Sequence, residues 1–230
     1  MADARLFGVR LSPFVEKVAR ALQLKKIPFT LVPPADPMAF RRWNPQTGKM
    51  PVLEMAGEHT FDSSLILRRL DRLVPNPPLF DPDASVAARQ RFLEDWSDES
   101  LYWYGMALRW ADVNAAATAA QVLGTLPAFV RPIAGLVLPR RLRAMGRAQG
   151  LARLPLEIVT EELGHRLGEL LEFLGSRPFF FSDRPSGADL ALFGQLGMLR
   201  SGPTPQAEAL INARPALLAY FDRVDAATAA

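Results

Sequence analysis

Residues 74–82 contain four prolines in nine positions. A proline inside a helix removes a backbone hydrogen bond and clashes with the preceding turn, so no helix can continue through this segment. Prolines at this density also stiffen a linker. We therefore expect a domain over residues 1–76, a proline-rich linker over 77–83 and a second domain over 84–230.

The chain before the linker alternates between strand and helix patterns. Strands are expected over 5–11, 29–32, 51–55 and 58–61, and helices over 13–25, up to Trp43, and over 63–73. The strand–helix–strand start predicts a parallel strand pair joined by a right-handed crossover. The first domain is therefore expected to be α/β.

The chain after the linker has almost no strand pattern. Helices are expected over 84–110, 115–123, 155–174, 186–199 and 215–224, where apolar residues recur at helical spacing. Ser186, with Asp189 three residues later, also has the spacing of a capping box. The second domain is therefore expected to be all-helical.

The composition excludes several kinds of site. The chain has no cysteine and only two histidines, His59 and His165. Disulfides, thiolate zinc sites and cysteine nucleophiles are excluded, and we expect no metal. No apolar run approaches the roughly 18 residues that span a bilayer. The first residues lack the apolar core of a signal peptide, so we expect a cytoplasmic protein.

Residues 49–64 have the pattern of an anion-binding site. Pro51 begins a short apolar strand, a turn and a second strand follow, and Asp62 and Ser63 then begin a helix. The free N–H groups and positive dipole end of a helix N-terminus suit a carboxylate. The alternative is a plain hairpin whose following helix is capped by Asp62 or Ser63.

Ser12 and Pro13 form a second helix start, because serine is a good cap and proline suits the first helical position. Capping alone would account for Ser12. The same position suits a thiolate, because the helix dipole and a hydroxyl donor both lower a thiol pKa. A lowering of about two units corresponds to about 2.7 kcal/mol of thiolate stabilisation.

Taken together, these motifs resemble the glutathione S-transferases, the tau class above all. The resemblance lies in Ser-Pro-Phe-Val at 12–15, Asn-Pro at 44–45, Gly-Lys-Met-Pro-Val-Leu at 48–53 and Asp-Ser-Ser-Leu-Ile at 62–66. The family usually has glutamate where this chain has Asp62. The resemblance covers residues 5–83 and implies a thioredoxin-like domain followed by an all-helical domain.

The resemblance also implies a glutathione site with these residues: Lys49, Met50, Pro51, Asp62 and Ser63. Lys49 would meet the glycine carboxylate, and Met50 would bond the cysteinyl backbone beside a cis Met50–Pro51 bond. Asp62 and Ser63 would hold the γ-glutamyl end.

Ser12 would be the catalytic residue of the implied reaction, in which the glutathione thiolate attacks an apolar electrophile without a metal. The family also implies a homodimer. The second-substrate pocket would consist of Phe14, Tyr102, Trp103, Met106 and Trp110. Such a pocket would favour apolar ligands. The alternative for these aromatic residues is helix–helix packing in the core.

The second half resembles the metaxin and failed-axon-connections branch in three places: Leu-Tyr-Trp-Tyr at 101–104, Arg-Trp at 109–110, and residues 174–183. That branch is not generally known for conjugating chemistry. It implies an alternative function, a non-enzymatic adaptor with a transferase fold.

A basic segment separates Asp112 from Glu157, with no acidic residue between them. It contains Arg131, Arg140, Arg141, Arg143, Arg147 and Arg153, and the apolar residues Phe129, Ile133, Leu136, Val137 and Leu138. Arg140, Arg141, Arg143 and Arg147 would suit an anionic surface. The interpretation we favour is that the apolar residues pack inside the helical domain and the arginines are solvated. No base-stacking motif accompanies them, so nucleic acid is not an expected partner.

Overall fold

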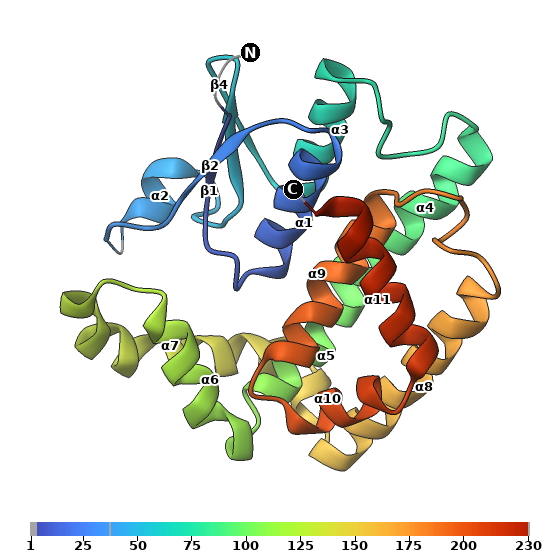
Figure 1. Cartoon of the computed structure of the whole chain (residues 1–230). Helices are drawn as coiled ribbons and strands as arrows, with labels where there is room; N and C mark the ends of the chain where they lie inside the picture. Colours follow the sequence, from blue (N-terminus) through green and yellow to red (C-terminus); the bar gives the residue numbers. More distant parts are fainter. Residues whose placement is uncertain (1–3, 37, 230) are drawn as a thin grey trace.

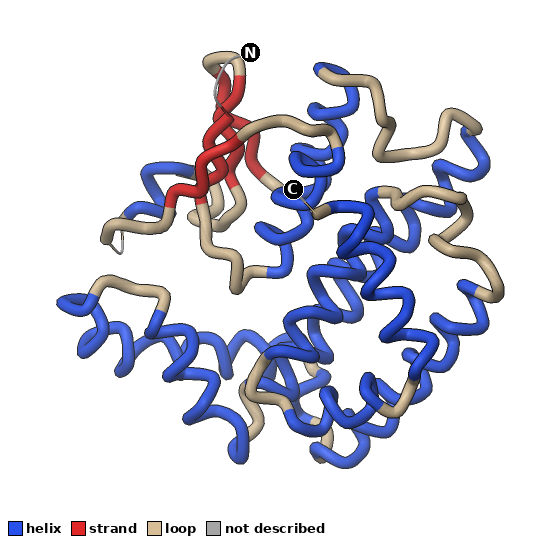
Figure 2. Tube along the Cα trace, viewed as in Figure 1, coloured by secondary structure: helices blue, strands red, loops and turns tan. Residues whose placement is uncertain are grey.

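The computed structural model describes residues 4–36 and 38–229. It begins with a small sheet of four strands, β1 (Ala4–Phe7), β2 (Phe29–Val32), β3 (Val52–Met55) and β4 (Glu58–Phe61). The strand order is β2-β1-β3-β4, with β1 parallel to β2 and the other two pairs antiparallel. Figure 2 shows the sheet at one side of the molecule, with the rest of the chain almost entirely helical.

Three helices accompany the sheet: α1 (Pro13–Leu24), α2 (Ala39–Trp43) and α3 (Ser63–Leu73). Helices α1 and α3 lie between the sheet and the helical domain, and α2 lies on the opposite side (Figure 1). Val15, Val18 and Leu22 of α1 are fully buried, as its three-and-four apolar spacing predicts.

The remaining elements are helical: α4 (Ala84–Trp96), α5 (Tyr102–Arg109), α6 (Asp112–Gly124), α7 (Arg131–Gln149), α8 (Leu156–Leu174), α9 (Gly187–Ser201), α10 (Pro205–Asn212) and α11 (Pro215–Thr228), with short η1 (Ser97–Leu101), η2 (Ala128–Val130) and η3 (Leu151–Arg153). The helix expected over 84–110 contains a π-helical turn, η1, between α4 and α5. Helices α7 and α10 were not predicted. The expected fold class, a thioredoxin-like α/β half followed by an all-helical half, is confirmed. The exact domain limits stay a prediction.

Helix α9 lies at the centre of the molecule and contacts α1, α4, α10 and α11. Its predicted capping box between Ser186 and Asp189 is confirmed. Asp189 is fully buried, and besides its bonds to Ser186 it accepts hydrogen bonds from the Phe180 N–H and the Tyr220 hydroxyl. Burial raises the pKa of Asp189. This carboxyl therefore ties α9 to α11 and to the loop before α9.

Gly194 of α9 lets this helix approach the start of α1. A methyl group on Gly194 would lie 2.4 Å from the Pro13 carbonyl oxygen, which is closer than real Cβ atoms come. Because Pro13 follows Ser12 directly, the missing side chain at Gly194 helps set where Ser12 lies.

Helices α6 and α7 form a hairpin that projects from the rest of the helical domain (Figure 1). The expectation that the apolar residues of the basic segment pack inside the domain is wrong for four of them. Phe129 is 74% exposed, Ile133 71%, Leu136 63% and Val137 58%. The projecting hairpin gives these side chains no core to enter. None of the described helices combines the length and the apolar composition that a bilayer-spanning segment needs.

Candidate functional site

Three loops that carry the predicted site residues adjoin the sheet at the same end of its strands. Phe7 of β1 pairs with Val52 of β3, and Val52 pairs with Phe61 of β4. The chain leaves the sheet directly after Phe7 and Phe61 and enters it directly before Val52. The segments 8–12, 49–51 and 62–63 therefore adjoin neighbouring residues at this end of the sheet.

The first loop begins with Gly8, where β1 ends earlier than the strand expected over 5–11. Gly8 has a φ of +151°, a conformation that L side chains rarely adopt. A methyl group there would lie 2.5 Å from Val15 Cγ2 and 3.4 Å from the Met50 sulfur. Gly8 thus lets the Ser12 loop lie close to α1 and to Met50, a role that the sequence patterns did not reveal.

Ser12 occupies the N-cap position of α1, and its carbonyl accepts a hydrogen bond from the Glu16 N–H at 3.0 Å. The predicted side-chain cap is not formed, because the hydroxyl makes no capping hydrogen bond. Ser12 is half-buried at the positive end of the α1 dipole. Its hydroxyl is therefore not committed to the helix it precedes.

The second loop is shaped by Asn44, whose side chain is buried. Its amide donates to the Thr47 hydroxyl at 2.6 Å and to the Lys49 carbonyl at 3.2 Å. These bonds set the path of the backbone into Met50 and leave Lys49 exposed. The Met50–Pro51 bond is cis, which confirms that prediction.

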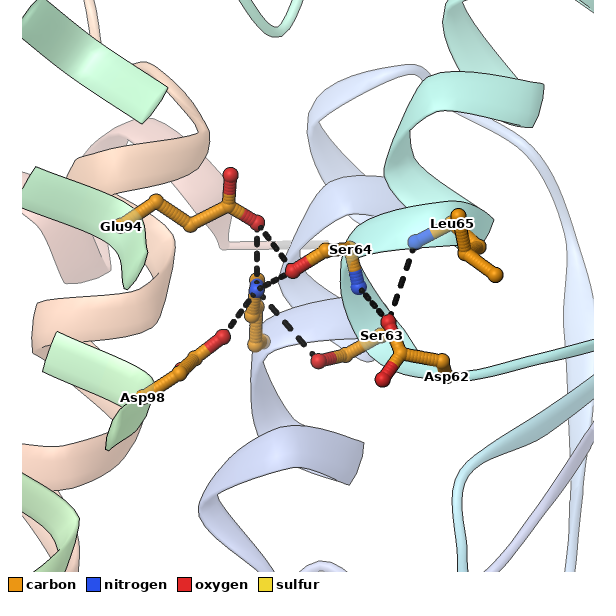
Figure 3. Close-up of polar contacts among 7 residues, drawn as sticks. Asp62, Ser63, Ser64, Leu65, Glu94 and Asp98 are labelled. Atoms are coloured by element: carbon orange, nitrogen blue, oxygen red, sulfur yellow. Dashed lines mark hydrogen bonds and ion pairs between the residues drawn. The ribbon is translucent and has the colours of Figure 1, made fainter. Parts of the chain in front are cut away.

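The third loop ends at Asp62, the N-cap of α3. Its Oδ1 accepts hydrogen bonds from the Ser64 N–H at 2.9 Å and the Leu65 N–H at 3.2 Å (Figure 3). The capping role considered for Asp62 is therefore confirmed. Its φ of +71° with a ψ of 131° is unfavourable for a side-chain-bearing residue. Strained backbone of this kind costs about 1–3 kcal/mol and clusters at ligand sites.

Ser63 belongs to a buried polar cluster that joins α1, α3, α4 and η1 (Figure 3). At its centre Lys17 Nζ lies 2.5 Å from Glu94 Oε1 and 2.6 Å from Asp98 Oδ2. Lys17 also donates to the hydroxyls of Ser64 at 3.1 Å and Ser63 at 3.4 Å. The cluster thus connects the predicted γ-glutamyl residues to the helical half.

This cluster holds one ammonium against two carboxyl groups. Burial lowers the pKa of Lys17, but Glu94 and Asp98 outweigh it, so the pKa lies above the ordinary value. Burial raises the pKa of Asp98 in spite of Lys17. One ammonium and two carboxyl groups are therefore buried together behind Ser63.

The residues predicted for the second-substrate pocket fall into two groups along α5. In the first, the ring centroids of Phe14 and Tyr102 are 5.1 Å apart, and those of Tyr102 and Trp103 are 5.2 Å apart. This group joins the start of α1 to α5. Burial raises the pKa of Tyr102. Met106 and Trp110 instead line a cavity of about 630 Å³.

This cavity lies between α5, α7, η3 and α8. Its floor includes buried Met106, Trp110 and Val159. Three arginines also line it, Arg143, Arg147 and Arg153. Arg143 donates to the Trp110 carbonyl at 3.2 Å and pairs with Asp112. Asp112 and Glu157 line it too, so the cavity combines buried apolar residues with side chains of both charges.

Comparison with known proteins gives one family. Sequence models of the glutathione S-transferase N-terminal and C-terminal domains match residues 6–78 and 164–224. Glutathione S-transferase U1 of Arabidopsis thaliana is 30% identical over 107 residues, 45% of this chain and 47% of that protein. The match thus spans about half the length of the curated relatives.

Solved structures match over almost the whole chain. A rice transferase, OsGSTU1, in complex with glutathione has a TM-score of 0.67 at 23% identity and covers 97% of this chain and 86% of its own. A Methylobacterium radiotolerans glutathione S-transferase in complex with glutathione sulfonate has a TM-score of 0.61 at 26% identity, with coverage of 97% and 91%.

Proposed function

Because the chain belongs to the glutathione S-transferase superfamily, with both family domains matched over more than half of its residues, we propose that it binds glutathione and transfers its thiolate to an apolar electrophile. The observation that carries this proposal is the pairing of Phe7, Val52 and Phe61. Because these three residues pair, the three site loops adjoin the same end of the sheet.

Each predicted residue has a chemical role that its surroundings support. Lys49 is exposed, as a residue that meets the glycine carboxylate must be. Met50 precedes the strand β3 and would bond the cysteinyl backbone. Asp62 uses Oδ1 for capping, and its other oxygen would accept a hydrogen bond from the γ-glutamyl ammonium.

Ser12 would stabilise the thiolate. The thiol proton passes to water, and the Ser12 hydroxyl then donates a hydrogen bond to the sulfur at the positive end of α1. The sulfur attacks the electrophilic carbon, a C–S bond forms, and the leaving group departs with its electron pair. Because the Ser12 hydroxyl has no capping bond, donating to a ligand would break no bond of the helix cap.

The acceptor would lie against Phe14, in the first turn of the helix that Ser12 precedes, and Tyr102, whose ring centroid lies 5.1 Å from that of Phe14. The cavity beside Met106 and Trp110 would extend this region. Its buried apolar residues would favour an acceptor with an apolar body. A cytoplasmic homodimer, as is usual in the family, is part of the proposal.

The test is capture of the full chain on immobilised glutathione, elution with free glutathione, and conjugation of an activated chloronitrobenzene followed by absorbance. The proposal expects both retention and turnover. Retention without turnover would reduce the function to glutathione binding. If the chain shows neither retention nor turnover, the proposal is rejected in favour of the adaptor alternative.

A further inference from the structure

The hairpin of α6 and α7 exposes large apolar side chains that a soluble surface rarely gathers. Four of them, Phe129, Ile133, Leu136 and Val137, lie within nine residues and are each more than half exposed. They belong to η2 and the first two turns of α7. Figure 1 shows this hairpin projecting from the helical domain. Contiguous exposed apolar residues of this kind mark an interaction surface.

The same helix face continues as a basic surface. Arg140 lies four residues after Leu136, and Arg141 lies four residues after Val137, so each arginine follows an apolar residue along one helix face. Both arginines are exposed. Among the described residues, neither forms an ion pair with a carboxylate. The exposed face of α7 thus has an apolar first half and a basic second half.

The charge of the hairpin selects one kind of partner. No acidic residue occurs between Asp112 and Glu157. An apolar surface beside unpaired arginines matches the boundary between acyl chains and anionic headgroups. A second copy of the chain would bring the same positive charges together, which would disfavour its docking on this face.

We propose that the exposed face of α7 docks the protein on an anionic lipid bilayer. Phe129, Ile133, Leu136 and Val137 enter the headgroup and acyl boundary. Arg140 and Arg141 contact the lipid phosphates and carboxylates. The association is peripheral, since no described helix can cross a membrane. It does not depend on glutathione binding or on catalysis.

The test is sedimentation of the purified full chain with vesicles of phosphatidylcholine alone or mixed with phosphatidylserine. Binding is expected on the mixed vesicles at low salt and should fall as salt screens the charges. Arg140→Gln with Arg141→Gln should lower the affinity about 25-fold, because each basic residue near such a surface contributes about fivefold. Ile133→Ser with Val137→Ser should also weaken binding, by removing apolar burial.

Matched controls change similar residues elsewhere. Arg68→Gln with Arg72→Gln removes two exposed arginines of α3, and Phe92→Ser removes a 78% exposed aromatic of α4. Both controls should bind vesicles like the wild type. Circular dichroism and thermal melting should be unchanged in all hairpin variants.

Three results would overturn the proposal. The first is no binding to anionic vesicles at low salt. The second is binding that the arginine variant loses but the Ile133 and Val137 variant keeps, which would mean contact with charge alone. The third is self-association in gel filtration that the Ile133 and Val137 variant abolishes, without vesicle binding, which would assign the face to a second copy.

Discussion

Replacing Lys17 with methionine should destabilise the protein strongly. Methionine replaces the apolar stem of lysine at similar volume, so little of the effect should come from a cavity. The variant loses the ammonium that lies 2.5 Å from Glu94 and 2.6 Å from Asp98, with the Lys17 side chain fully buried. Removing one partner of a buried ion pair costs about 3–5 kcal/mol.

The loss of stability in Lys17→Met should depend on pH. In the wild type Lys17 lowers the pKa of Asp98 against the larger effect of burial, so the variant should have a still higher Asp98 pKa. In the folded variant Asp98 would then keep a proton that it releases in the unfolded chain. The stability of the variant should therefore fall as pH rises from the ordinary aspartate pKa to the raised pKa of Asp98. The stability that Lys17 gives the wild type is present below the ordinary lysine pKa and lost as pH rises through its raised pKa.

Urea unfolding at several pH values measures this, with Lys26→Met as the control for an exposed lysine next to α1. We expect a deficit of about 3–5 kcal/mol at pH 7 for Lys17→Met and a smaller one at pH 5. Adding Asp98→Asn to Lys17→Met should restore part of the stability. A deficit under about 1 kcal/mol that does not vary with pH would refute the reasoning.

Asp62→Asn keeps a capping oxygen but removes the charge, so we expect glutathione affinity to fall by about 1–3 kcal/mol in calorimetry with little change in stability. The control is Asp83→Asn, which alters the equivalent two-bond cap of α4 and should leave affinity unchanged. Ser63→Ala should lower glutathione affinity by about 1 kcal/mol; equal affinity would remove it from the site. Gly194→Ala should lower both melting temperature and turnover by displacing Pro13, whereas Gly168→Ala, which meets no atom within 4 Å, should not.

The α/β half could be predicted element by element because its signals are local. The helix that begins at Ser63 follows a cap, and the strands are bounded by proline or glycine. Helix α7 was missed because Pro132, Gly135 and Pro139 lower its helix propensity. The burial of Ile133 was predicted wrongly because an apolar pattern does not say whether a partner surface exists.

The buried cluster could not be found from the sequence. Lys17 is separated from Ser63 by 46 residues and from Asp98 by 81, so no spacing rule connects them. Gly194 was missed for the same reason, since only the packing of α9 on α1 shows why a side chain is excluded there. The candidate site residues were predicted from family resemblance. The fold explains why the loops that carry them adjoin the same end of the sheet.

The most direct test of the account is the pKa of the glutathione thiol when bound to the protein, measured from thiolate absorbance as a function of pH. We expect a value about two units below that of free glutathione in the wild type, equivalent to about 2.7 kcal/mol, and a return towards the free value in Ser12→Ala. Because the hydroxyl forms no capping bond, the free energy of unfolding of Ser12→Ala should lie within about 0.5 kcal/mol of the wild-type value. A bound thiol with the same pKa in both proteins would contradict the role assigned to Ser12.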